Sequence, residues 1–94
     1  IKGVLCANDA MSFGVIQAIE AAGKTGEIVV ASIDAEDAAI ENVKNNLALA
    51  TVYNNQDAQA AKALEVAVEM LNGNAVDEDI IVETILFTKD NLPK

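Results

Sequence analysis

The sequence predicts an α/β fold built on a mostly parallel sheet, with the element order β-α-β-α-β-α-β. Two observations lead to this prediction. Short apolar runs rich in β-branched residues alternate with longer segments whose apolar residues recur every three or four positions. The short runs also lack polar alternation, which is typical of strands covered on both faces. Right-handed crossovers between such strands predict a doubly wound sheet.

The first half of the chain supplies two strands and two helices. A short apolar run at 4–7 predicts the first strand, and an apolar stripe over 10–22 predicts the helix that follows. Gly23 is a natural helix end. The nearly continuous apolar run at 28–33 predicts a strand. A second helix is expected at about 36–45, with acidic residues in its first turn, where they suit the helix dipole.

The second half continues the alternation. Residues 47–53 predict a third strand, and 57–72 predict the clearest helix, since its apolar positions recur at i, i+4, i+7, i+8 and i+11. Gly73 ends this helix. A last strand is expected at 80–87, and residues 88–94 form a tail.

Composition excludes several classes of function. The 94 residues carry fifteen acids, six bases and no histidine, a net charge of −9. Binding to nucleic acid depends on Lys and Arg neutralising phosphates, so a nucleic acid partner is not expected. Without histidine there is no histidine-based acid–base catalysis, no serine–histidine triad and few options for zinc. A single cysteine, Cys6, excludes an internal disulfide, and no glycine-rich phosphate loop occurs. We therefore predict no enzyme activity, no catalytic or metal-binding residues and no cofactor.

Three polar residues follow three successive predicted strands: Asn8, Asp34 and Asn54. In open parallel sheets, ligands bind outside the carboxyl ends of the strands. Amides both donate and accept hydrogen bonds, while an ionised carboxylate only accepts. Two amides and one carboxylate at one edge therefore suit a neutral, polyhydroxylated ligand such as a sugar.

Each residue also has a purely structural interpretation. Asn8 and Asp34 precede helices and are candidate caps, and Asn54 lies in a polar stretch that a turn would explain. Asp9 could hold a metal with Asp34, or it could instead cap a helix or bond to the following loop.

Five segments, taken in chain order, resemble bacterial periplasmic sugar-binding proteins of the ribose and galactose/glucose type: residues 4–14, 21–24, 29–35, 50–54 and 88–92. The resemblance implies a two-lobe receptor that closes on a sugar and delivers it to the membrane permease of an ABC importer. Its lobes are three-layer α/β sandwiches. Asn8, Asp34 and Asn54 match family positions that hydrogen-bond the sugar. Ala31-Ser32 departs from the Gly-Phe or Gly-Val usual before this aspartate.

The resemblance covers about the last third of such a protein. It implies that residues 1–53 form part of the C-terminal lobe. Residues 54–94 would form the hinge crossing, a segment returning to the N-terminal lobe, and the C-terminal strand and tail. We expect a fragment that needs its missing N-terminal portion, or a swapped copy of itself, for stability. The location implied is periplasmic or extracellular, with a lipoprotein anchor as one variant, and this segment carries no signal peptide.

Two other functions remain open from the sequence. The same fold serves as the effector domain of lactose-repressor-type regulators, and an upstream helix-turn-helix would decide for it. A receiver-like domain that accepts a phosphoryl group would use Asp9 and Asp34 as a magnesium pocket, with Lys89 beside the phosphate.

Overall fold

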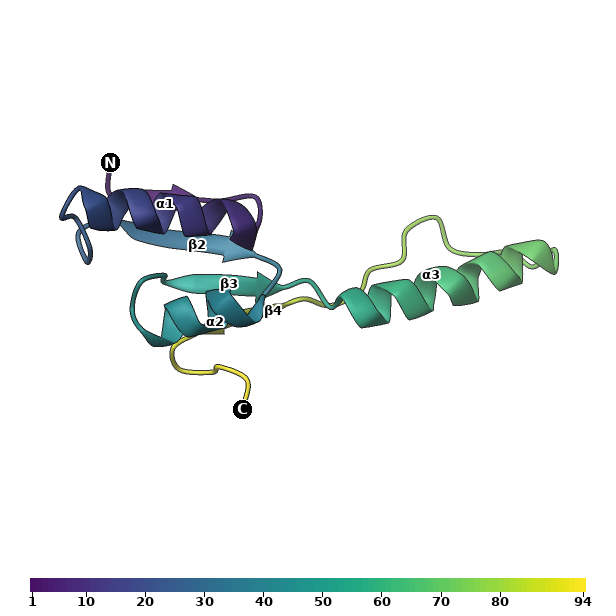
Figure 1. Cartoon of the computed structure of the whole chain (residues 1–94). Helices are drawn as coiled ribbons and strands as arrows, with labels where there is room; N and C mark the ends of the chain where they lie inside the picture. Colours follow the sequence, from purple (N-terminus) through teal and green to yellow (C-terminus); the bar gives the residue numbers. More distant parts are fainter. The chain divides into compact units, whose positions relative to one another are not determined.

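The computed structural model describes residues 1–94, and its elements follow the predicted order (Figure 1). They are β1 (Gly3–Leu5), α1 (Asp9–Ala21), β2 (Val29–Ile33), α2 (Asp37–Lys44), β3 (Ala50–Tyr53), α3 (Gln56–Leu71) and β4 (Ile85–Thr88). No helix combines the length and the apolar character needed to cross a membrane.

The four strands form one sheet in the order β1-β2-β3-β4. β1 pairs with β2 and β2 with β3 in parallel, whereas β4 returns antiparallel to β3. The predicted mostly parallel sheet is thus confirmed. Strands that succeed one another in the chain and in the sheet need crossovers of one hand, so α1 and α2 fall on the same face.

The core lies between this face of the sheet and the two helices. It contains residues from β2, both helices and the loops beside them: Cys6, Ile16, Ile19, Val30, Val43 and Ala48. Along β2, Val30 is 1% exposed but its neighbour Val29 is 50% exposed, because successive side chains point to opposite faces. Leu5 and Leu86 also remain exposed. Among residues 1–54 and 85–94, helices therefore cover only one face of the sheet.

Two strands begin three or more residues later than the sequence predicts. The expected strand at 47–53 starts at Ala50 because the amides of Leu47 and Ala48 both bond to the carbonyl of Asn42, at 2.8 and 3.1 Å. This part of the apolar run closes the end of α2 and packs on the core instead of joining the ladder. The last strand starts at Ile85 rather than at residue 80.

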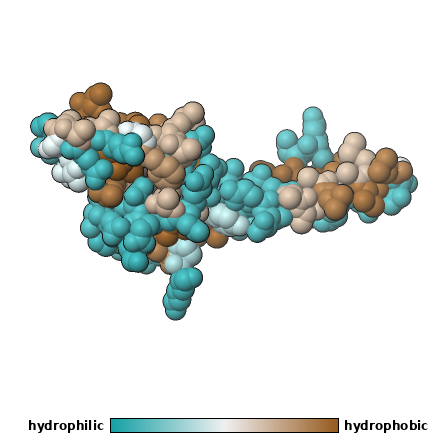
Figure 2. Space-filling view, viewed as in Figure 1, coloured by the Kyte–Doolittle hydropathy of each residue, from teal (hydrophilic) through white to brown (hydrophobic).

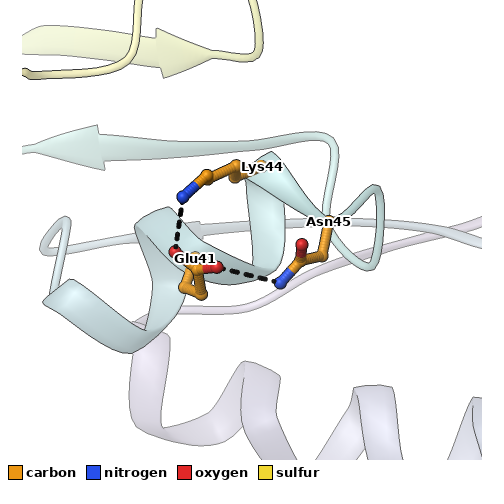
Figure 3. Close-up of polar contacts among 3 residues, drawn as sticks. All are labelled: Glu41, Lys44 and Asn45. Carbon is orange, nitrogen blue, oxygen red and sulfur yellow. Dashed lines mark hydrogen bonds and ion pairs between the residues drawn. The ribbon is translucent and has the colours of Figure 1, made fainter.

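Polar contacts hold the C-terminal end of α2 (Figure 3). Glu41 receives the Lys44 ammonium on one carboxylate oxygen at 3.4 Å and the Asn45 side-chain amide on the other at 3.2 Å. Lys44 in the last turn also suits the helix dipole. All three side chains are exposed, so these contacts stabilise the fold only slightly.

The chain divides into two compact units. The first unit comprises residues 1–54 and 85–94, with the sheet, α1 and α2; the second comprises 55–84, with α3. None of the residues of α3 is buried, and Leu64 and Leu71 are 69% and 86% exposed. Apolar side chains gather along this helix in Figure 2. The second unit therefore has no core of its own.

Candidate functional site

The candidate site is the edge of the sheet formed by the carboxyl ends of β1, β2 and β3. These strands are adjacent and parallel, so their ends meet at one edge. Asn8, Asp34 and Asn54 follow β1, β2 and β3 in turn, and all three belong to the first unit. Each is partly buried. The sequence-predicted residues therefore share one edge, as the alternation of strands and helices predicted.

Asn8 is the N-cap of α1. Its backbone is extended, and its side-chain Oδ1 accepts a hydrogen bond from the Met11 amide at 2.9 Å. The cap interpretation of this residue is confirmed. A cap uses the carbonyl oxygen of the side chain and leaves the amide nitrogen as a donor. Capping therefore fixes the direction of the side chain without using its donor group.

Asp34 lies in an unusual turn between β2 and α2. Its φ is 124° and that of Ala35 is 57°, both in the region that favours glycine. Each such residue costs about 1–3 kcal/mol and persists only where its surroundings enforce it. Asp34 is not the N-cap residue of α2, because that position belongs to Glu36, which makes no side-chain cap bond. Asp34 thus precedes α2 in a backbone conformation that favours glycine.

Asn54 directly follows β3 and is the last residue before the second unit begins. The next residue, Asn55, has a left-handed backbone with φ 53° and serves as the N-cap of α3 without a side-chain cap bond.

Asp9 lies beneath this edge, fully buried at 0% exposure. Its Oδ1 accepts hydrogen bonds from the hydroxyls of Ser32 and Thr51, the latter at 2.8 Å. Its Oδ2 accepts from the Glu36 amide at 2.8 Å. The structural interpretation of Asp9 is confirmed only in part: Asp9 does form structural hydrogen bonds, but to two strand hydroxyls and to the loop between β2 and α2 rather than to the loop that follows it in the chain. Three donors on one carboxylate are the compensation that a buried charge requires.

Ser32 and Thr51 are the partners that sequence reasoning did not single out. They are 2% and 0% exposed; Ser32 is the only hydroxyl-bearing residue of β2, and Thr51 lies between two apolar residues of β3. A buried polar residue needs a hydrogen-bond partner. A hydroxyl residue inside a predicted buried strand was therefore the feature of the sequence that could have indicated these two residues. At the position where the chain departs from the Gly-Phe or Gly-Val pattern, Ser32 contributes its hydroxyl to the Asp9 network.

The receiver-like alternative is wrong. In that fold the first strand lies between the second and third, whereas here β2 lies between β1 and β3. The receiver-like alternative also assigned Asp9 to magnesium. Both carboxylate oxygens of Asp9 instead accept hydrogen bonds, from Ser32, Thr51 and the loop before α2. No cluster of three potential metal-ligating side chains occurs.

Comparison with known families decides the classification. The model of a family described as periplasmic binding protein domain matches residues 1–75. The chain belongs to this family. Family membership agrees with the resemblance seen in the sequence, and with the mostly parallel α/β sheet.

Individual family members show the same pattern. A D-xylose-binding periplasmic protein of Haemophilus influenzae is 39% identical over 70 residues, which make up 74% of this chain and 21% of the relative. A solute-binding protein of Bacillus halodurans with bound myo-inositol matches 98% of the chain at 39% identity and a TM-score of 0.84. One from Agrobacterium vitis with bound D-fucose matches all of it at 29% identity and a TM-score of 0.88. The chain spans 32% of each of these two structures.

Proposed function

We propose that this chain carries part of the binding site for a neutral polyhydroxylated ligand, a sugar or cyclic polyol. The observation that carries the proposal is the position of Asn8, Asp34 and Asn54 at one edge of the sheet. Together they offer two amide donors and a carboxylate acceptor to ligand hydroxyls. The relatives support this chemistry, since xylose, myo-inositol and fucose are the ligands that their names or structures specify.

The whole protein would be the receptor component of an ABC sugar importer. It would hold its ligand without reacting with it, and it would pass the ligand to a membrane permease. Two structural neighbours are described as ABC transporter solute-binding proteins, which supports this role. The name of the xylose-binding relative supports a periplasmic location.

Residues 1–53 would belong to the C-terminal lobe of a two-lobe protein, and residues 54–94 would contain the hinge crossing and the segment that returns to the N-terminal lobe. The division of the chain near Asn54 supports this assignment. The apolar surface of α3, which the chain does not bury, would pack on that other lobe.

Isothermal titration calorimetry of the full-length protein, meaning the natural protein that contains these residues, tests the proposal. We expect binding to at least one of D-xylose, D-ribose, D-allose, D-fucose, D-galactose, D-glucose and myo-inositol. Asp34→Ala should weaken it by about 1–3 kcal/mol, because ligand hydroxyls lose their acceptor in a desolvated site. Asp37→Ala, an exposed acid three residues away, is the matched control and should bind normally. Failure of every ligand to bind would refute the proposal.

A further inference from the structure

Hydrogen bonds from three consecutive amides hold the turn that carries Asp34. Three consecutive amides each have a fixed acceptor. The Asp34 amide donates to the Val52 carbonyl at 2.8 Å, the Ala35 amide to the Thr51 hydroxyl at 3.1 Å, and the Glu36 amide to Asp9 at 2.8 Å. The turn is therefore anchored residue by residue to β3 and to the first residue of α1.

Two of these acceptors form one buried network. The hydroxyl of Thr51 accepts from Ala35 and donates its single hydrogen to Asp9, while Ser32 donates to the same carboxylate oxygen. Asp9, Ser32 and Thr51 are each at most 2% exposed, so the bonds among their side chains are shielded from solvent, while the bond from Ala35 to Thr51 is partly buried. Low exposure strengthens each bond and makes the loss of any one costly.

The network explains how the turn keeps its conformation. Asp34 and Ala35 both have positive φ, which L side chains rarely adopt. Such residues persist where the surroundings over-determine them, and in known proteins they cluster at ligand-binding positions. Here the surroundings are Asp9 and Thr51, which come from α1 and β3.

We propose that Asp9, Ser32 and Thr51 are positioning residues for the ligand: they hold the 34–36 turn so that the Asp34 carboxylate is preorganised at the edge of the sheet. This inference rests on the proposed function. Asp9 and Thr51 affect ligand binding only indirectly, by holding the turn. Asn8, which follows β1, is joined by its peptide bond to Asp9, so the same network links two of the three ligand-binding positions.

Variants at Thr51 in the full-length protein test this role. Thr51→Val keeps the shape of the side chain but removes both the acceptor for Ala35 and the donor to Asp9. Ligand affinity should fall roughly tenfold, the equivalent of one to two lost hydrogen bonds. Thr51→Ser retains the hydroxyl and should restore affinity to within about twofold of the original value. Ligand-free hydrogen exchange at the Ala35 amide should be faster in Thr51→Val and restored in Thr51→Ser.

Ser12→Ala is the matched control. Ser12 is 1% exposed, and its hydroxyl donates to the Asp9 carbonyl at 2.7 Å, within α1 rather than to the side-chain network that holds the turn. This variant should lose stability without losing affinity or changing exchange at Ala35. Equal loss of affinity in Ser12→Ala and Thr51→Val would overturn the positioning role, because affinity would then simply follow stability.

The outcomes separate the two proposals. Normal affinity in Thr51→Val, with a ligand that binds the unsubstituted protein, would overturn the positioning role and leave the binding function standing. Unchanged exchange at Ala35 in that variant would also overturn it. Failure of the unsubstituted protein to bind any of the tested polyols would overturn both proposals.

Discussion

Replacing Asp9 by Asn should destabilise the fold far more than a change of one atom suggests. In the structure, Oδ1 accepts from two hydroxyls and Oδ2 from the Glu36 amide. In its best orientation, an asparagine would keep its side-chain oxygen as the acceptor for the hydroxyls of Ser32 and Thr51. Its NH₂ group would then face the Glu36 N–H, so two hydrogen-bond donors would point at each other. That loses a hydrogen bond to a charged group, worth about 1.5–3 kcal/mol, and strands a donor where exposure is 0%.

We therefore expect Asp9→Asn to lower the free energy of unfolding by about 3 kcal/mol. This is a large part of the roughly 5–15 kcal/mol typical of a folded protein. The measurement is urea denaturation of the full-length protein without ligand, followed by circular dichroism. A reduced midpoint with an unchanged dependence on urea would show that stability alone has changed.

Asp37→Asn is the control, because Asp37 is also an acid in the first turn of a helix but is exposed. It should lose only the interaction with the helix dipole, about 0.3–1 kcal/mol. Equal losses in the two variants would mean that Asp9 acts merely as a first-turn acid. The account of a buried network that organises this edge would then be refuted.

Two further predictions concern the cap and the uncovered surfaces. Asn8→Ala removes the cap of α1, so it should lower the free energy of unfolding in urea by about 1 kcal/mol and should also weaken ligand binding. Asn8→Asp keeps the cap acceptor but loses the amide donor. It should therefore restore the stability but not the affinity. Normal calorimetric affinity in Asn8→Asp would show that capping is its only role. Residues 1–94 expressed alone should associate, because α3 buries nothing and exposed apolar patches favour association. A monodisperse monomer by light scattering, with a cooperative thermal melt, would contradict this.

The element order and the location of the candidate site could be predicted because both depend on local patterns. Helical periodicity, short apolar runs and glycine at helix ends involve residues a few positions apart. Parallel strands then bring their carboxyl ends to one edge, so residues that follow the strands, such as Asn8 and Asp34, are placed together by topology alone. The antiparallel direction of β4 and the late start of β3 were not predictable in this way, because each depends on which strand or helix end the segment meets.

By itself, the sequence determined the α/β class, the exclusion of histidine chemistry and the polar residues at the edge of the sheet. Only the tertiary structure decided what Asp9 does and how Asp34 is held. The physical reason is distance along the chain: Asp9 bonds to residues 23, 27 and 42 positions away. No local pattern encodes such partners, and a buried carboxylate acquires its role only when the fold brings the donors to it.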